Sequence, residues 1–284
     1  MTLEKPLEYE VMHHYGSRRL KANVLTALER AGVEAAVMTA EDLSPIDEFH
    51  IGGRDATRHA VDKLLLRPED DVLDVGCGIG GAARFMASSY GCRVTGVDLT
   101  AEYVELADEL TSRTGLSDRV THIRATALAL PFEGGSFDAA VILHAGMNVE
   151  NKAQMYDEVS RVLKPGGRLV IYDVMRIAPG QLQYPLPWAA NEHLSFLATP
   201  TQSKSLLDAA GLVVRGMEDR SDAGLAYFAA RQAAMAGADM GSALGPHLLM
   251  GEDANLKVRN TKAPIRAGIL APVEIIAVKR GGEC

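Results

Sequence analysis

VLDVGCGIGG, residues 72–81, joins a short apolar strand to a glycine-rich turn that opens a helix. Glycines are needed where the backbone approaches a ligand closely, and a helix N-terminus offers unpaired N–H groups and the positive end of a dipole. Asp98 ends the next strand along the chain, where its carboxylate can accept hydrogen bonds from both hydroxyls of a ribose. The pattern predicts a nucleoside site beside the end of the first strand.

Strand-like and helical patterns alternate from about residue 70 onward. Short apolar runs rich in β-branched residues predict parallel strands buried on both faces, and stripes at spacings of three and four predict helices between them. The alternation is typical of an α/β fold with a doubly wound sheet and right-handed crossovers. The predicted strands are 72–75, 93–98, 119–124, 137–143, 168–174 and 272–279; the helical stripes are Tyr103, Leu106, Ala107 and Leu110, and Met155, Val159, Val162 and Leu163.

Three regions interrupt this alternation. Residues 1–60 contain an amphipathic stretch, which we interpret as an N-terminal helical lid on a core formed by 61–284. The proline-rich segment 176–200 and the Ala- and Met-rich segment 222–268 are predicted to be insertions, the first of them facing the substrate.

Composition excludes several classes of protein. Apolar residues make up 47% of the 284 residues and the formal net charge is −8, so a positive field for nucleic acid is absent. No window is apolar enough for a membrane span, and the N-terminus lacks the pattern of a signal peptide. Three cysteines are too few for a disulfide framework, and no metal site is predicted. We expect a cytoplasmic protein that binds neither nucleic acid nor a membrane, and a homo-oligomer is compatible with the sequence.

The glycines alone do not identify the nucleoside. Gly76, Gly78 and Gly81 also satisfy the G-x-G-x-x-G fingerprint of dinucleotide-binding folds. Two further segments favour another cofactor: ALPFEGGSFDAAV (129–141) and EVSRVLKPGGRLVIYDV (158–174). With Asp74, they resemble the class I S-adenosylmethionine-dependent methyltransferases over roughly residues 50 to 220. HIGGRDAT (50–57), GGAARF (80–85) and YGCRVTGVDLT (90–100) look most like the sarcosine/dimethylglycine N-methyltransferases.

The resemblance implies the class I fold of about seven strands and S-adenosylmethionine as cofactor. It implies that Asp74 holds the amino group of the cofactor and that Asp98 binds the ribose. Thr126 stands where many relatives carry an aspartate that binds the adenine amine. The remaining implied cofactor contacts are Gly76, Gly78 and Gly80 at the methionine moiety, Leu99 and Leu128 on the adenine faces, Ala127 beside them, and His144.

The acceptor side is predicted from the loop after the fourth strand, HAGMNVEN (144–151). His144 is the candidate for contact or proton transfer, because this loop lies beside the sulfonium at the carboxyl ends of the strands. An amino-acid acceptor would need an arginine for its carboxylate and an aromatic wall for its amine. The predicted acceptor-binding residues are Met147, Asn148, Tyr15, Arg176 and Trp188, with Arg54 and Tyr184 as further candidates.

These observations predict a methyltransferase for a small-molecule acceptor, of the sarcosine or dimethylglycine type. An O- or C-methyltransferase for a quinone, polyketide or prenyl compound is the alternative. A nicotinamide dehydrogenase and a non-catalytic S-adenosylmethionine-binding protein are more distant alternatives.

Overall fold

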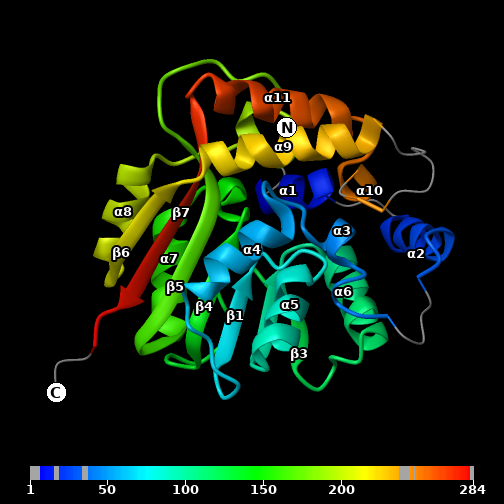
Figure 1. The fold of residues 1–284 in the computed structure, drawn as a ribbon. Helices are drawn as coiled ribbons and strands as arrows, with labels where there is room; N and C mark the ends of the chain where they lie inside the picture. The colour runs from blue at the N-terminus through cyan, green and yellow to red at the C-terminus, as the bar shows by residue number, and fades with distance from the viewer. Residues whose placement is uncertain (1–6, 16–18, 34–37, 237–243, 246, 282–284) are drawn as a thin grey trace, which may run out of the picture.

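The sheet has seven strands in the order β3-β2-β1-β4-β5-β7-β6, and only β7 runs antiparallel to its neighbours (Figure 1). The structure is a computed structural model that describes residues 7–15, 19–33, 38–236, 244–245 and 247–281. The strands are β1 Asp71–Val75, β2 Arg93–Asp98, β3 Val120–Arg124, β4 Phe137–Leu143, β5 Leu163–Arg176, β6 Leu212–Asp219 and β7 Leu270–Lys279. The predicted doubly wound α/β fold is therefore confirmed.

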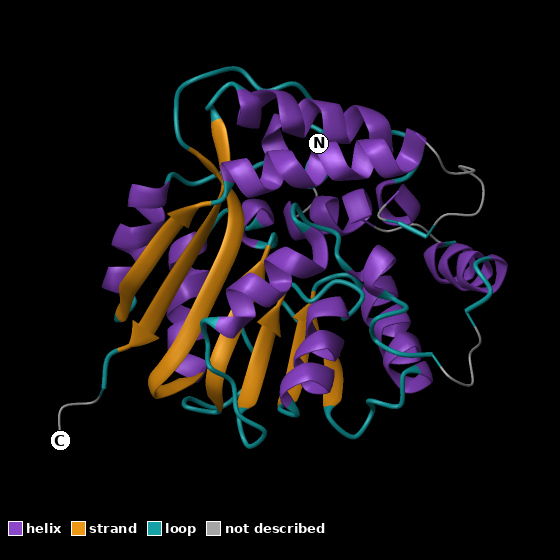
Figure 2. Ribbon diagram, viewed as in Figure 1, coloured by secondary structure: helices purple, strands orange, loops and turns teal. Residues whose placement is uncertain are grey.

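Helices cover both faces of the sheet (Figure 2). Helices α4 and α5 pack on one face through a core that includes Ala60, Phe85 and Val141, and α7 and α8 pack on the other through Met155, Leu207 and their neighbours. The helices are α1 Leu7–Tyr15, α2 Leu20–Arg30, α3 Ser44–Asp47, α4 Gly53–Asp62, α5 Gly81–Tyr90, α6 Ala101–Arg113, α7 Lys152–Val162, α8 Pro200–Ala209, α9 Ser221–Ala236, α10 His247–Met250 and α11 Ala254–Arg266, with short 3-10 turns η1 Gly146–Asn148 and η2 Glu192–Leu194.

Two elements differ from the predicted pattern. Strand β6 was not predicted, because it lies at the edge of the sheet and much of it is exposed, so its sequence lacks a continuous apolar run. Strand β5 begins at Leu163, directly after α7, and so includes the KPGG segment that reads as a turn. The predicted stripe of α7 therefore ends at Val162, and Leu163 belongs to the sheet.

The segments outside the alternating core gather above the carboxyl ends of the strands. Helices α9 and α11 lie side by side across the top of the molecule in Figure 1, and they share an apolar cluster with Val11 of α1 and with Trp188. The lid boundary predicted at residue 60 falls inside α4, whose Ala60 and Val61 are buried against the sheet. None of the described helices is long and apolar enough to cross a membrane.

Candidate functional site

The glycine-rich turn follows β1, where the order of strands in the sheet changes direction. Strands β2 and β3 lie on one side of β1, and β4 lies on the other. In open α/β sheets this switch point forms a crevice beyond the carboxyl ends of the strands. Gly76 and Gly78 have φ values of 77° and 54°, which disfavour side chains. A Cβ on Gly76 would lie 2.3 Å from the Cβ of Ala145, so β1 and the loop after β4 approach each other only because this residue is glycine.

Asp98 closes the turn from the neighbouring strand. Its carboxylate accepts hydrogen bonds from the backbone N–H of Gly78 at 3.0 Å and of Thr100 at 2.8 Å. Burial raises the pKa of Asp98, and these N–H donors oppose the rise. The carboxylate lies in the wall of the cavity, where its remaining lone pairs can accept from the hydroxyls of a ribose.

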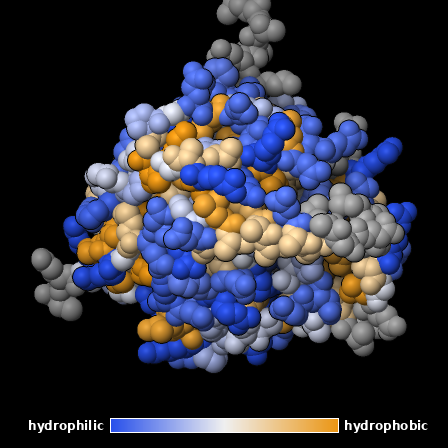
Figure 3. All heavy atoms as spheres, turned by 45° about the horizontal axis from the view of Figure 1, so that its top comes forward, coloured by the Kyte–Doolittle hydropathy of each residue, from blue (hydrophilic) through white to orange (hydrophobic). Residues whose placement is uncertain are grey.

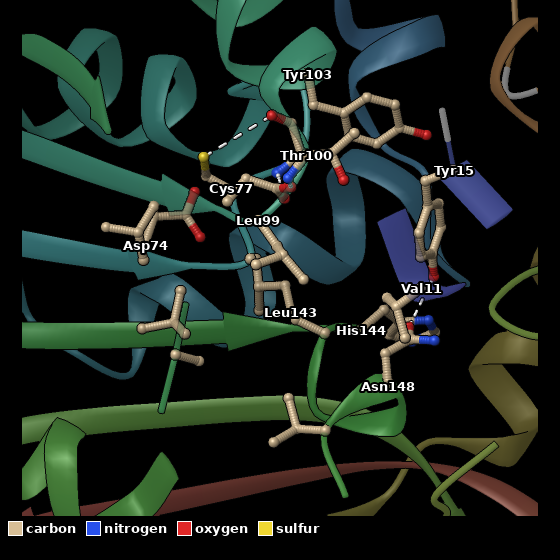
Figure 4. Close-up of a pocket in the computed structure, with 18 of the residues that line it drawn as sticks. Val11, Tyr15, Asp74, Cys77, Leu99, Thr100, Tyr103, Leu143, His144 and Asn148 are labelled. Atoms are coloured by element: carbon tan, nitrogen blue, oxygen red, sulfur yellow. Dashed lines mark hydrogen bonds between the residues drawn. The ribbon is translucent and has the colours of Figure 1, made fainter. Parts of the chain in front are cut away.

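Asp74, the second-last residue of β1, supplies a second carboxylate on the floor of the cavity (Figure 4). It is 2% exposed, and its Oδ2 has no hydrogen-bond partner among the described residues. Burial, with smaller contributions from the charges of Asp98 and Glu48, raises the pKa of Asp74 to about 7. A buried acceptor without a donor fits an ammonium group, so the residues present fit the cofactor implied by the sequence.

The far end of this cavity is lined by Leu99, Ala127 and Leu128. The hydroxyl of Thr126 donates to the Glu8 carboxylate, which comes from α1, and accepts from the backbone N–H of Leu128. Thr126 therefore links the first helix to the cavity wall. We call this 350 Å³ cavity, between the glycine-rich turn and α1, the cofactor cavity.

His144 stands at the inner end of the cofactor cavity, immediately after β4. Its φ of 53° is unusual for a residue with a side chain and points to a backbone held by its surroundings. The backbone N–H of His144 donates to the carbonyl of Tyr172 at 2.7 Å. Two residues later, a Cβ on Gly146 would lie 2.3 Å from Oδ2 of Asp173, so the Asp173 carboxylate packs against this loop. The Nε2 of His144 has no partner in the described chain, and burial lowers the pKa of its imidazole well below the ordinary value.

A second cavity of about 470 Å³ begins where the first ends. The two cavities share four lining residues: Tyr15, Phe49, His50 and His144. The second one extends between Trp188, Phe228 and the helices α9 to α11, and we call it the acceptor cavity. Its volume falls within the range of small-molecule sites.

The four shared residues form the junction of the two cavities, and one of them, Tyr15, is held by Asn148 (Figure 4). The hydroxyl of Tyr15 donates to Oδ1 of Asn148 at 2.8 Å, and the amide of Asn148 donates to the carbonyl of Trp188 at 2.6 Å. Trp188 in turn donates through Nε1 to Ser195 Oγ at 3.0 Å. The junction thus joins α1, the loop after β4 and the 176–200 segment.

The structure places most of the predicted site residues around the two cavities and places two of them, Arg176 and Gly80, outside both. Met147 and Trp188 line the acceptor cavity, and Asn148 lines the cofactor cavity. Arg176 lines neither, because its guanidinium turns away and donates to the carbonyl of Gly180. Gly80 also lies outside the cofactor cavity: it is the N-cap of α5, and a Cβ there would lie 2.5 Å from Nε2 of His122. Arg176 and Gly80 therefore stand outside both cavities, and Gly80 serves the packing of α5 against His122.

Sequence reasoning missed the role of the segment before α4. Glu48 and His50 both line the cofactor cavity, and Nε2 of His50 lies 2.9 Å from Glu48 Oε2 and from Thr57 Oγ1. Burial alone would raise the pKa of Glu48, but the hydrogen bond from His50 and the charge of Arg54 hold it below its ordinary value. Arg54, a predicted acceptor ligand, is therefore engaged with this carboxylate at 3.0 Å. The HIGG motif (50–53) was the sequence feature that could have pointed to this segment.

One group outside the site has the composition of a metal site. His59, Glu218 and Glu274 place their ligand atoms within 4.8 Å of one another. The Lys63 ammonium contacts both glutamates. It supplies the positive charge that a cation would otherwise bring, so the group is explained as an ion-pair network.

Comparison with known families identifies the centre of the chain. Residues 73–171 match a family model described as a methyltransferase domain. Over this segment the chain is similar to methyltransferase domains. It contains Asp74, Asp98 and His144, and domains of its class I type take their methyl group from S-adenosylmethionine. The predicted class of domain and its cofactor are confirmed at this level.

Relatives of the methyltransferase domain act on different acceptors. A sterol 4-C-methyltransferase of Caenorhabditis elegans is 35% identical over 118 residues, which are 42% of this chain and 35% of the relative. The chain spans between 28% and 48% of the length of the curated relatives it matches.

Solved structures extend the likeness of fold to nearly the whole chain. Geranyl diphosphate C-methyltransferase from Streptomyces coelicolor matches with a TM-score of 0.70 at 19% identity, over 97% of this chain and 98% of that one. A putative sarcosine dimethylglycine methyltransferase from Galdieria sulphuraria matches with a TM-score of 0.60 at 24% identity, over 79% and 82%. The elements outside 73–171 therefore belong to the same fold.

Proposed function

We propose that this chain transfers a methyl group from S-adenosylmethionine to a carbon atom of a small, largely apolar acceptor. The observation that carries the proposal is the meeting of two cavities at His144, one acidic and matched to the cofactor, the other walled by aromatic and aliphatic side chains. The C-methylating sterol enzyme among the relatives supports the same choice.

Binding and alignment are the main tasks of the residues. S-adenosylmethionine supplies an activated methyl group when it is bound, and attack must occur in line with the breaking bond to sulfur. Asp74 would hold the amino group and Asp98 the ribose, while Leu99, Ala127 and Leu128 would contact the adenine. Thr126 would accept from the adenine amine in place of the usual aspartate. The methyl would then point past His144 into the acceptor cavity.

The protonation state of His144 favours carbon as the site of methylation. When a carbon–carbon double bond takes up a methyl cation, the resulting carbocation is strongly acidic and gives its proton to a weak base. A hydroxyl acceptor instead requires a base with a pKa near the operating pH. The lowered pKa of His144 favours its neutral imidazole, whose Nε2 has no partner in the described chain, and this suits the first reaction better.

An N-methyltransferase of the sarcosine/dimethylglycine type is the second candidate. Arg231 and the aromatic rings of Trp188 and Tyr227 line one cavity, and together they are the groups that a small amino acid would use. The size of that cavity argues for a larger acceptor. Liquid water occupies about 30 Å³ per molecule, so an acceptor of six heavy atoms would leave most of the 470 Å³ to solvent.

Transfer of labelled methyl distinguishes the two candidates. Purified protein is incubated with methyl-labelled S-adenosylmethionine and, in separate reactions, a sterol, a prenylated hydroquinone, an acyclic isoprenoid, sarcosine and dimethylglycine. Products are analysed by mass spectrometry, and the labelled atom is located by NMR. We expect the label on carbon of an isoprenoid-type compound. Label confined to dimethylglycine or betaine would establish the second candidate instead, and failure of the protein to bind S-adenosylmethionine by calorimetry would overturn both.

A further inference from the structure

The acceptor cavity has a charged end that the methyl transfer itself does not use. Arg231 on α9 and Arg259 and Lys262 on α11 line it together, and we call these three residues the cationic cluster. Helices α9 and α11 lie side by side in Figure 1, and the ammonium of Lys262 donates to Gln232 Oε1 at 3.3 Å across them. Figure 3 turns this side of the molecule forward and shows hydrophilic side chains beside hydrophobic ones.

The positive charge of the cationic cluster is not neutralised within the part of the chain that is described. No aspartate or glutamate lines the acceptor cavity, and no described carboxylate lies within the 4.0 Å ion-pair distance of Arg231, Arg259 or Lys262. Basic residues elsewhere are commonly paired, as Arg168 is with Asp70 at 2.6 Å. Three cations without a carboxylate partner among the described residues, one of them the exposed Arg259, are a local departure from the composition of a chain with a net charge of −8.

Neighbouring groups feel this charge. The pKa of His247, which lines the same cavity, is lowered by burial and further by the charge of Arg231. The guanidinium of Arg231 also lies 5.9 Å from the centre of the Tyr227 ring, a cation–π distance that holds it against the cavity wall. An anion entering here would meet positive charge and donors, and a neutral histidine that can accept a proton.

The side chains that line the cavity indicate what kind of acceptor it can hold. His144 and Tyr15 stand at the junction with the cofactor cavity, and the cationic cluster lies on helices that contribute nothing to that cavity's wall. Apolar side chains line much of the remainder, including Met147, Trp188, Phe228 and Val258. The cavity therefore combines a junction with the cofactor cavity, an apolar lining and the cationic cluster on α9 and α11.

We propose that the acceptor carries a carboxylate or phosphate at the end of an apolar body, and that the cationic cluster binds this anion while the other end reaches His144. The proposal deepens the proposed function, since it rests on the acceptor cavity being the place where the methyl is received. Arginine and lysine bind both kinds of anion by charge-assisted hydrogen bonds.

A series of ligands with one chain and different head groups tests the proposal. Octyl phosphate, octanoate and 1-octanol are titrated into the protein in the presence of S-adenosylhomocysteine. Trp188 is the only tryptophan of the chain and lines the cavity, so its fluorescence reports on occupancy, with calorimetry as a second readout. We expect at least one of the two anions to bind about tenfold or more tightly than the alcohol, since hydrogen bonds between charged groups are stronger than those to a neutral hydroxyl. Preference for phosphate or for carboxylate names the head group.

Removal of the charge gives the decisive comparison. The variant Arg231→Gln/Arg259→Gln/Lys262→Gln should lose the preference for the anion while its affinity for octanol changes little. The matched control is Arg67→Gln/Arg215→Gln/Arg266→Gln, which removes three exposed arginines outside the cavity and should keep the preference. In the unmodified protein, added salt should weaken only the anions. Equal affinities for all three ligands, no binding of either anion, or a preference that survives the charge removal would each overturn the proposal.

The same samples separate this test from the proposed function. Binding of S-adenosylhomocysteine without an anion preference would contradict the cationic cluster as a binding site and leave methyl transfer intact. An anion preference in protein that does not bind the cofactor would support the cluster and contradict the proposed reaction.

Discussion

The two cavities meet at four shared residues yet differ in charge. The cofactor cavity is lined by six carboxylates, those of Glu8, Asp47, Glu48, Asp74, Asp98 and Glu150, and among the described residues no lysine or arginine joins them. The acceptor cavity has the reverse pattern: two arginines and a lysine line it, and no carboxylate does so in the described part of the chain. A sulfonium and an ammonium are favoured in the first cavity, whereas an anionic end group is favoured in the second.

This difference indicates how the site keeps its two ligands apart. Each ligand would meet charge of its own sign in the wrong cavity, and like charges disfavour binding there. The junction, formed by the four shared residues Tyr15, Phe49, His50 and His144, is then the place where the reacting atoms would meet. The predictions below test the two sides separately, beginning with the junction.

His144→Ala should lower turnover with the accepted substrate by about a hundredfold, the lower end of what a positioned proton acceptor contributes. The dissociation constant of S-adenosylhomocysteine should stay within about twofold, because the methionine and ribose contacts remain. Steady-state kinetics and calorimetry measure the two effects. His193→Ala, an exposed histidine on η2, serves as the control. Unchanged turnover would remove His144 from the reaction.

Asp98→Ala should weaken cofactor binding by about ten- to a hundredfold, because it removes a half-buried carboxylate that accepts charge-assisted hydrogen bonds. Binding of octyl phosphate to the acceptor cavity should change little. Calorimetry with S-adenosylhomocysteine measures the first and Trp188 fluorescence the second. Glu105→Ala, an exposed glutamate on α6, is the control. Wild-type affinity in the Asp98 variant would contradict the ribose assignment.

The affinity for the cofactor should rise several-fold between pH 5.5 and 7.5. The pKa of Asp74 is raised to about 7, so its carboxyl is neutral at the lower pH and charged at the higher one, where it attracts an ammonium. The α-amino group of the ligand stays largely protonated over this window. Calorimetry at stepped pH checks the trend, and Asp74→Asn should flatten it. A flat profile in the unmodified protein would exclude Asp74 as the ammonium ligand.

Tyr15→Phe should have the smallest effect and should be felt on both sides. It removes the hydrogen bond to Asn148, which contributes about 0.5–1.5 kcal/mol. We expect two- to tenfold weaker binding of both S-adenosylhomocysteine and octyl phosphate by calorimetry. Tyr9→Phe, on the same helix but outside both cavities, tests for a general loss of α1 packing. An effect on only one ligand would show that the junction is not shared.

The cofactor half of the site was largely predictable from sequence. Asp74, Gly76, Gly78 and Asp98 lie within one strand–turn–helix unit and the strand beside it, so their spacing along the chain fixes their positions in space. Gly80 was misplaced because spacing does not tell whether a glycine faces a ligand or a neighbouring side chain, here that of His122.

The acceptor half comes from segments far apart in the chain, and their packing is not written in any local pattern. Met147, predicted from the loop after the fourth strand, and Trp188 and Tyr15, predicted from segments that the alternation leaves out, all line one of the two cavities. The cationic cluster was missed. Arg259 and Lys262 stand three apart on one face of α11, which was the available signal, but only the packing of α9 against α11 adds Arg231.

The hydrogen bond from Tyr15 to Asn148 ties the only described helix before residue 19 to the floor of the site. Leu7, Glu8 and Val11 of α1 also cover the cofactor cavity. If the products of the proposed reaction leave by movement of α1, that movement would break this bond and withdraw the Tyr15 side chain from the acceptor cavity as well. Departure of the two products would then be coupled, and an opening step of this kind is slower than chemistry in many enzymes.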